Sequence, residues 1–238
     1  MKKSILYRFV QTYGRYTLMS IVILTLSLLF LPYIYFFPKR IFKAWELLAK
    51  AVLFVLGVRV KIYGQIPNDG QAYVVVANHT SFIDTFLIPL YFQGAPGTVF
   101  LHQLFMKIPI LNIWMKLLKV IPINPKNNNG VLSGIKKAVS FLRKDKISLV
   151  IFPEGTRTTT GIMRDFKPGA LSIAVMAQAD IIPLGFIGSY NFKPKNRWWL
   201  EPGEVAVYTG EIIRTKGKNK EELSFLAKQA VETLLAGK

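Results

Sequence analysis

Two side chains within residues 78–84 have the chemistry and the spacing of a proton-transfer pair: His79 and, five positions later, Asp84. His79 follows the apolar run 73–77. A residue that leaves a buried strand at its carboxyl end lies where open α/β sheets usually build their sites. The pair supplies a base and an orienting carboxylate without a serine or cysteine nucleophile beside it. We therefore expect the nucleophile to come from the substrate.

The geometry of this pair requires a break in helical structure. Residues five apart on one helix lie about 140° apart around its axis, so the two side chains could not face each other on a continuous helix. We therefore expect His79 to precede a helix over 82–91, with Thr80 or Ser81 as its N-cap and Asp84 in its first turns. The alternative is that His79 is a packing or helix-start residue and Asp84 a solvated carboxylate.

A second polar turn follows the apolar strand predicted over 147–152, and its sequence is Pro153-Glu154-Gly155-Thr156-Arg157. A glycine in such a turn lets the backbone approach a ligand closely, and an arginine can grip phosphate oxygens through two parallel hydrogen bonds. The turn therefore predicts a phosphate site. Taken alone, Glu154 and Arg157 are also compatible with a surface ion pair, but two polar strand-end turns in one basic chain favour a functional site.

Short apolar runs alternate with helix-period segments, which predicts an α/β fold with a mixed, largely parallel β-sheet covered by helices. Strands are predicted over 58–63, 72–77, 98–101, 120–123, 147–152, 182–187 and 205–209. Helices are predicted over 82–91, 112–118, 131–143, 170–178 and 221–235. With 238 residues and 51% hydrophobic content, the chain can bury one such core. We assign it to an α/β catalytic domain over 58–238, preceded by an N-terminal two-helix membrane-anchoring motif over 1–57.

The N-terminal region is apolar and uncharged over 16–38. Residues 41–58 then place apolar side chains at helical spacing, with Glu46 among the charged residues off that stripe. Pro32 limits the uninterrupted apolar part to 18–31, which is too short to cross a bilayer as an untilted helix. We therefore predict a helical hairpin inserted in one leaflet. A single spanning helix and a cleaved signal peptide are the alternatives.

A net charge of +18, from 31 Lys and Arg against 13 Asp and Glu, calls for an anionic partner. Nucleic acid and an anionic membrane both qualify, and the apolar N-terminal segment favours the membrane. The loop over 191–203 carries Arg197, Trp198 and Trp199, which fits an interfacial membrane contact, a stacking platform for nucleic acid or plain loop packing. The absence of cysteine excludes disulfides and thiolate chemistry. No Cys-His cluster or carboxylate pair indicates a metal.

Together the two turns resemble the motifs of the glycerophospholipid acyltransferase family, Asn-His-x4-Asp and Phe-Pro-Glu-Gly-Thr-Arg, which stand here at 78–84 and 152–157 with the family's usual spacing. Residues 107–109 and 120–123 resemble its second motif region, and 181–184 its fourth. The resemblance covers roughly residues 58–210. The most similar subgroup is that of the bacterial 1-acyl-sn-glycerol-3-phosphate acyltransferases (lysophosphatidic acid acyltransferases), which form phosphatidic acid.

The resemblance implies acyl transfer from a thioester, acyl-CoA or acyl-carrier protein, to the sn-2 hydroxyl of lysophosphatidic acid, with no cofactor and no metal. His79 is the implied general base, and Asp84 orients it, so no covalent acyl-enzyme is needed. The implied substrate-binding residues are Asn78, Glu154, Gly155, Thr156, Arg157 and Lys126. We also expect a phospholipid membrane as partner, at the cytoplasmic face of a bacterial inner membrane, and no nucleic acid; the oligomeric state stays open.

Two departures from the family pattern concern the acceptor. Many members carry Ala-Lys-x-Glu-Leu where this chain has Leu-His-Gln-Leu-Phe at 101–105, and Ile-Asp-Arg where it has Ile-Asn-Pro at 123–125. Pro125 thus stands where the resemblance would place an arginine for the acceptor phosphate, and Lys126 can supply a point charge but no planar fork. Another lysolipid acceptor is therefore an alternative, as is a non-catalytic basic protein that binds membrane or nucleic acid.

Overall fold

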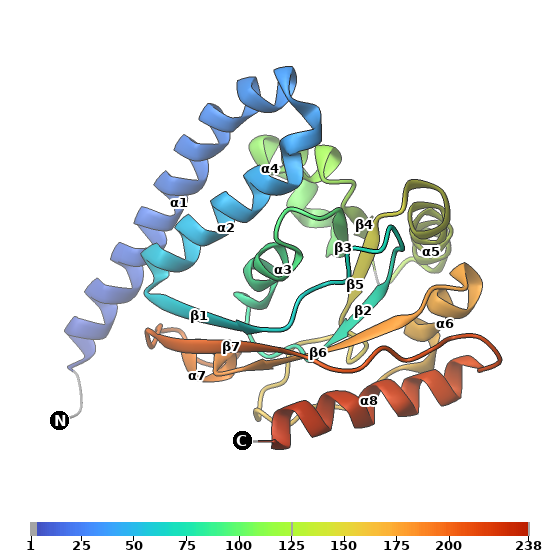
Figure 1. Ribbon diagram of the computed structural model, residues 1–238. Coiled ribbons are helices and arrows are strands. Elements are labelled where there is room, and N and C mark those ends of the chain that lie inside the picture. Colours follow the sequence, from blue (N-terminus) through green and yellow to red (C-terminus); the bar gives the residue numbers. More distant parts are fainter. Residues whose placement is uncertain (1–3, 125, 238) are drawn as a thin grey trace.

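The computed structural model describes residues 4–124 and 126–237 and contains a seven-stranded sheet between two layers of helices (Figure 1). The strand order is β1-β7-β6-β2-β5-β3-β4. Only the β6–β7 pair is antiparallel among these neighbouring strands. The predicted fold class, a mixed and largely parallel sheet covered by helices, is confirmed. The strands are β1 (Val58–Tyr63), β2 (Val74–Ala77), β3 (Gly97–His102), β4 (Ile121–Ile123), β5 (Ser148–Ile151), β6 (Ile181–Ile187) and β7 (Gly203–Thr209).

Different helices cover the two faces of the sheet, because successive strand residues point to opposite faces. Val75 and Ala77 of β2 share one hydrophobic core with helices α2, α3 and α4, whereas Val74 and Val76 share the other with α5, α6 and α8. All four side chains are fully buried, as expected for a parallel strand covered on both faces. The helices are α2 (Ile41–Leu56), α3 (Asp84–Phe92), α4 (Pro109–Leu117), α5 (Asn128–Ser140), α6 (Pro168–Ala177) and α8 (Lys220–Ala236).

The predicted strands and helices of the sheet region are all present, and their ends differ from the prediction by no more than three residues. The elements that were not predicted are short, because one turn of helix carries too little periodicity to be recognised. They are η1 (Pro38–Arg40), η2 (Gln103–Lys107) and α7 (Ser189–Phe192). η3 (Phe141–Asp145) is a π-helical turn that continues α5 and overlaps the helix predicted over 131–143.

Helix α1 (Ile5–Phe36) and α2 pack side by side as the predicted hairpin, joined through η1 (Figure 1). α1 is longer than the apolar run predicted, because it starts within the basic N-terminal flank and continues through Pro32. Its 32 residues correspond to about 48 Å. By length and composition it could cross a membrane, a property that core helices and N-terminal signal sequences share. It is consistent with an N-terminal membrane anchor in either the hairpin or the spanning arrangement.

Glu46, predicted off the apolar stripe of α2, is nevertheless a buried residue. This side chain is only 3% exposed, and its two carboxylate oxygens bind Lys43 at 2.7 Å and Lys50 at 2.6 Å. Residues three and four apart are neighbours on a helix, so the two lysines reach the carboxylate from adjacent turns. The carboxylate lies beside β1 and the end of α3, where Val60 and Leu90 line the same space.

The boundary predicted after residue 57 coincides with the end of α2, where Gly57 caps the helix and β1 begins at the next residue. Leu53 and Leu56 of α2 belong to the same hydrophobic core as β2 and α3. The hairpin is therefore packed onto the sheet region along α2. Its division into a separate domain stays a prediction.

Candidate active site

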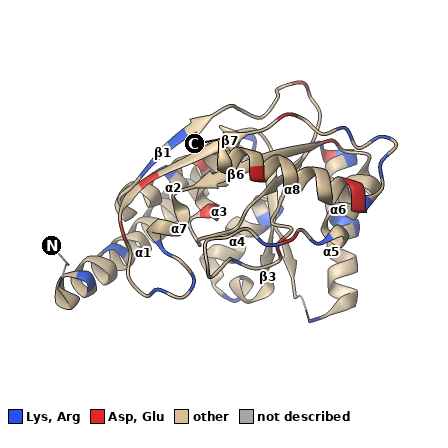
Figure 2. Cartoon of the chain, turned by 90° about the horizontal axis from the view of Figure 1, so that it is seen from below, with Lys and Arg blue, Asp and Glu red and all other residues tan. Residues whose placement is uncertain are grey.

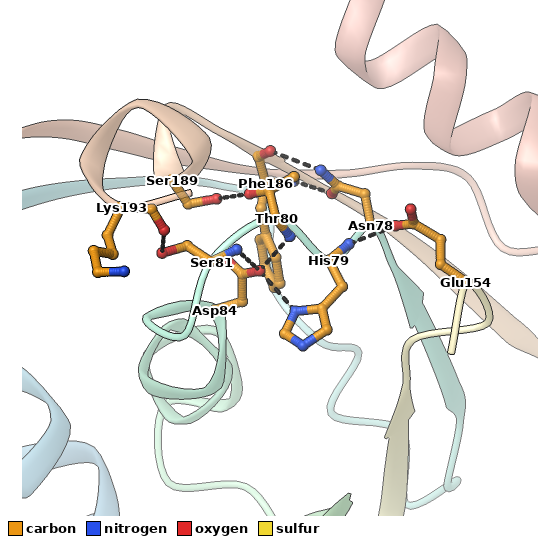
Figure 3. Close-up of polar contacts among 9 residues, drawn as sticks. All are labelled: Asn78, His79, Thr80, Ser81, Asp84, Glu154, Phe186, Ser189 and Lys193. Atoms are coloured by element: carbon orange, nitrogen blue, oxygen red, sulfur yellow. Dashed lines mark hydrogen bonds and ion pairs between the residues drawn. The ribbon is translucent and has the colours of Figure 1, made fainter. Parts of the chain in front are cut away.

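The turn after β2 brings His79 and Asp84 into direct contact. Nδ1 of His79 lies 2.8 Å from Oδ2 of Asp84 (Figure 3). The same oxygen accepts hydrogen bonds from the backbone N–H groups of Thr80 at 2.7 Å and Ser81 at 2.8 Å. The Asp84 side chain is fully buried, whereas that of His79 is 20% exposed. The imidazole is therefore held by its inner nitrogen and can meet a substrate with its outer one.

The start of the following helix differs from the prediction. α3 begins at Asp84, and neither Thr80 nor Ser81 caps it. Their hydroxyls bind the segment after β6 instead: Thr80 Oγ1 lies 2.5 Å from Ser189 Oγ, and Ser81 Oγ donates to the carbonyl of Lys193 at 2.9 Å. Asp84 accepts hydrogen bonds from the N–H groups of Thr80 and Ser81, so one carboxylate both closes the turn and orients His79.

Glu154, in the turn after β5, lies on the other side of His79 and binds backbone rather than the ring (Figure 3). Its Oε1 accepts the N–H of His79 at 2.7 Å, and its Oε2 accepts the N–H of Arg164 at 2.9 Å. The residue is 3% exposed, and burial raises the pKa of its carboxyl against the opposing effect of these hydrogen bonds. Both oxygens thus already have partners, and the implied role of Glu154 at the acceptor stays a prediction.

Asn78 and Phe152 fix the same turn from two further directions. The Asn78 side chain pairs with the backbone of Phe186 on β6, donating to its carbonyl at 3.0 Å and accepting from its N–H at 2.7 Å. The ring of Phe152 stacks on that of His79, with centroids 4.1 Å apart and planes 19° apart. Asn78 was predicted among the substrate-binding residues and lies here in a buried backbone contact. The Phe152 contact was not predicted, although both residues follow neighbouring parallel strands.

Positive charge without a counter-ion gathers at this edge of the sheet. Among the described residues, the Arg157 guanidinium has no hydrogen bond or ion pair. The ammonium of Lys193, in the loop after α7, donates a hydrogen bond to the carbonyl of Pro194 at 3.3 Å. It has no other hydrogen-bond partner among the residues that the structure describes. Burial lowers the pKa of Lys193, and the positive charges of Arg157 and Arg197 lower it further. Arg157 and Lys193 are therefore two neighbouring cations that an anion would stabilise. Lys193 was not among the predicted site residues.

The remaining predicted residues lie at different distances from this centre. Gly155 adopts φ +73°, and Thr156 accepts a hydrogen bond from Lys195 at 3.3 Å, both in the turn after β5. Lys126 is exposed after β4, which is three strands from β2 and thus about 14 Å away across the sheet. Pro125 lies outside the described residues.

The loop over 191–203 packs against α1. Trp198 stacks with Tyr13 at 6.4 Å between centroids, the guanidinium of Arg8 lies 4.5 Å from the Trp199 ring, and Thr12 accepts the N–H of Leu200 at 3.1 Å. These contacts show that the loop packs on α1, and the favoured membrane contact of this loop stays a prediction. Lys and Arg also lie on most other elements, with far fewer Asp and Glu (Figure 2). Within the described residues, no group of three or more His, Asp and Glu could hold a metal ion.

This fold and site define a class of α/β proteins in which a histidine in contact with a buried carboxylate stands at the carboxyl edge of a parallel sheet, beside a second turn that carries an arginine. Comparison with known proteins makes the assignment specific. The family model described as Acyltransferase matches residues 57–187, and the chain belongs to this family. The resemblance found from the two motifs is thereby confirmed.

The proteins that are similar to this chain are named as acyltransferases. The crystal structure of the 1-acyl-sn-glycerophosphate acyltransferase PlsC from Thermotoga maritima superposes with a TM-score of 0.79 at 26% identity, covering 96% of this chain and 98% of that one. A putative 1-acyl-sn-glycerol-3-phosphate acyltransferase from Caenorhabditis elegans is 30% identical over 76% of this chain and 64% of its own length. The corresponding enzyme from Pseudomonas aeruginosa is 26% identical over 74% and 67%. The match to this chain covers 64% of the length of the relative from C. elegans, 56% of that from Cocos nucifera and 58% of that from Mycoplasma pneumoniae.

Proposed function

We propose that this protein transfers a fatty acyl group from an acyl thioester to the sn-2 hydroxyl of 1-acylglycerol-3-phosphate, forming phosphatidic acid. The observation that carries the proposal is the 2.8 Å contact between His79 Nδ1 and Asp84 Oδ2 at the carboxyl end of β2. The names of the relatives from C. elegans, P. aeruginosa and T. maritima support the same substrate. Widely separated side chains would instead have favoured a non-catalytic binding protein.

The lipid hydroxyl acts as the nucleophile in this proposal. The chain has no cysteine, and the Ser81 hydroxyl donates its hydrogen to the Lys193 carbonyl. With Nδ1–H of His79 donated to Asp84, Nε2 has a free lone pair and accepts the proton of the attacking hydroxyl. The stacked Phe152 keeps the imidazole in one orientation.

The reaction then proceeds without a covalent acyl-enzyme. The deprotonated oxygen bonds to the thioester carbonyl carbon and gives a tetrahedral intermediate. Its collapse breaks the C–S bond, and the departing thiolate takes the proton back from Nε2. Between these steps Asp84 stabilises the imidazolium of His79. General-base catalysis of this kind contributes about 10² to 10⁴ in rate.

Arg157 and Lys193 bind the phosphomonoester of the acceptor. A guanidinium matches two phosphate oxygens, and an ammonium adds a point charge from the opposite loop. A dianion between them offsets both the burial and the repulsion that lower the pKa of Lys193. Gly155 and Thr156 shape the turn that carries Arg157, and Lys126 adds positive charge at longer range.

The location follows from the substrates. Acceptor and product stay in the bilayer, so α1 and α2 would hold the site at the cytoplasmic face of a bacterial inner membrane. The donor arrives from solution as acyl-CoA or acyl-carrier protein. A chain of net charge +18 suits the phosphates of the first and the acidic surface of the second.

A panel of lysolipids tests the proposal. Purified protein receives one acyl-CoA and, separately, lysophosphatidic acid, lysophosphatidylcholine, lysophosphatidylethanolamine or monoacylglycerol in mixed micelles, and products are measured by mass spectrometry. We expect lysophosphatidic acid to be preferred by about tenfold or more, because a charge-assisted hydrogen bond contributes about 1.5–3 kcal/mol. Equal rates with neutral headgroups would reject the phosphate assignment, and no transfer to any acceptor would reject the activity.

A further inference from the structure

We propose that η2 and α4 form a second membrane contact beside the N-terminal hairpin, and that the partner is a bilayer containing anionic phospholipids. The segment carries five large apolar side chains that are 42% to 56% exposed: Leu104, Phe105, Ile108, Ile113 and Leu117. Soluble surfaces rarely gather so many large apolar groups in a few residues. The proposal concerns how the protein binds the bilayer and does not depend on its acyl transfer activity.

Helix α4 has one face for the core and another for a partner. Trp114, Met115 and the following Leu118 are buried against the sheet-facing core. Ile113 and Leu117 are four residues apart, so they lie on one face, and that face is exposed. The exposed face is thus not needed to fill the protein interior.

The exposed apolar face of α4 adjoins the apolar surface of the hairpin. Phe30 of α1 meets Trp114 of α4 edge to face, with ring centroids 6.3 Å apart. Leu31 and Ile34 of α1 line an apolar cavity of about 440 Å³ together with Ile113 and Leu117. α4 stands beside the upper part of the hairpin in Figure 1. Segments about 80 residues apart in sequence therefore present one apolar surface, and its larger part belongs to the helix that is consistent with a membrane anchor.

Charge favours anionic lipid as the occupant. The chain has no acidic residue between Asp84 and Asp145. Lys107 and Lys116 are exposed on the segment itself, next to its apolar side chains. Lysines in this position bury their stems in the apolar layer and keep their ammonium groups among the headgroups. An acidic protein would match the lysines and leave the apolar side chains without a partner.

The contact would also orient the site. η2 directly follows β3, which is parallel to β5, and β5 is parallel to β2. The carboxyl ends of these strands share one edge of the sheet, so η2 and the His79 turn lie at the same edge. Two points of attachment, the hairpin and α4, would fix the orientation of the protein on the bilayer. They would keep that edge of the sheet against the membrane.

Single-cysteine labelling tests the contact, because the chain has no cysteine of its own. An environment-sensitive fluorophore is attached to Ile113→Cys or Leu117→Cys in the full-length protein. The matched control is Phe225→Cys, whose side chain is 67% exposed on α8, the helix that covers the opposite face of the sheet. Vesicles of phosphatidylcholine and phosphatidylglycerol, with or without nitroxide groups on their acyl chains, are then added.

We expect the labels at 113 and 117 to brighten several-fold and to be quenched by the nitroxide lipids, while the label at 225 is not. Labels at 113 and 117 that stay as unquenched as the control overturn the proposal. So does a response to acyl-carrier protein that vesicles fail to produce. Circular dichroism checks folding, and either labelled position alone suffices for the test.

A second measurement isolates the charge. The double variant Lys107→Gln/Lys116→Gln should lower partition into anionic vesicles by about tenfold and leave partition into neutral vesicles unchanged. Lys218→Gln is the matched control, since Lys218 lies in the loop after β7, at the other edge of the sheet. Equal partition of the wild-type protein and the double variant into anionic vesicles would overturn the role of the lysines.

Discussion

The turns after β2 and after β5 lie side by side and differ in how their charged groups are paired. In the first, Asp84 is fully buried and one of its oxygens accepts three hydrogen bonds. In the second, Arg157 is only half-buried and has no partner among the described residues. The first turn is already organised around its histidine, whereas the second has an unused donor group.

This difference separates chemistry from recognition. A buried carboxylate oxygen that accepts three hydrogen bonds, as Oδ2 of Asp84 does, holds its neighbours within narrow limits, which a proton transfer requires. An unpaired guanidinium at a surface keeps its binding capacity for a ligand. Substitutions in the first turn should therefore reduce kcat, and substitutions in the second should raise KM.

The largest effect is expected from His79→Ala. Loss of the base should lower kcat for phosphatidic acid formation by about 10² to 10⁴, with little change in KM for the lysolipid. Membrane binding should not change, because the hydrogen bonds and the ring contact that His79 makes with Asp84, Glu154 and Phe152 lie in the site itself. Initial rates at saturating acyl-CoA measure the effect. Turnover close to that of the wild-type protein would exclude His79 as the base.

Arg157→Met should give the opposite kinetic pattern. The KM for lysophosphatidic acid should rise by about tenfold to a hundredfold, because one charge-assisted interaction is lost, and kcat should change by only a few-fold. Arg157→Lys should recover part of the loss, since it restores the charge without the planar fork. Arg214→Met, which removes an exposed arginine paired with Asp180, is the control. A fall in kcat with unchanged KM would contradict the division between the turns.

The sequence predicted the contact between His79 and Asp84 in the first turn, whereas the phosphate site assigned to the second turn stays a prediction. The contact between His79 and Asp84 could be predicted from local properties. These are the apolar strand before His79 and the separation of about 140° that residues five apart would have on one continuous helix. The caps assigned to Thr80 and Ser81 were wrong because Ser189 of α7 and a carbonyl just after α7 compete for their hydroxyls. Such competition is decided by tertiary geometry, which hydrophobic periodicity does not encode.

The same limit applies to long side chains elsewhere. Glu46 was expected off the buried stripe of α2, but it is buried between two lysines, beside β1 and the end of α3. Lys193 joins the site through the Ser81–Lys193 hydrogen bond, across 112 positions of sequence. The strands and helices were predictable because each repeats a pattern over several residues. A contact between single distant side chains has no such repeat.

Glu154→Gln tests whether the two turns are held together at their backbones. Glutamine keeps the shape but places an NH₂ group against one of the two N–H donors, those of His79 and Arg164. A buried donor left unsatisfied costs about 1–3 kcal/mol, so the free energy of unfolding should fall by that amount where the wild-type carboxylate is ionised and accepts both N–H groups. Glu204→Gln, at an exposed ion pair with Lys61, should have little effect.

The pH dependence of this variant has a definite sign. Burial raises the folded pKa of Glu154 above its ordinary 4.5, so the native state keeps the proton to higher pH than the unfolded state. The contribution of the wild-type residue is therefore full below 4.5 and declines as pH rises through the folded pKa. The stability deficit of Glu154→Gln should narrow over the same range, as urea unfolding in detergent at several pH values would reveal. Parallel curves for the two proteins would contradict the assignment.

The smallest effect, and the finest test of the comparison, is expected from Gly155→Ala. Gly155 has φ +73°, and an added Cβ would lie 2.9 Å from Nζ of Lys167, the mobile end of a side chain that can move aside. The cost is then mainly that of a left-handed backbone, about 1 kcal/mol in stability. Arg157, two residues later, should shift with the turn and raise KM a few-fold.

Gly217→Ala provides a matched control, because Gly217 has φ +79° and open space around its Cβ position, in the loop after β7. It should lose the same stability without any change in KM. If Gly155→Ala lowers kcat as strongly as it raises KM, strain in the second turn reaches His79 through Glu154. The two turns would then work as one mechanical unit, and the separation of proton transfer from anion binding would be wrong.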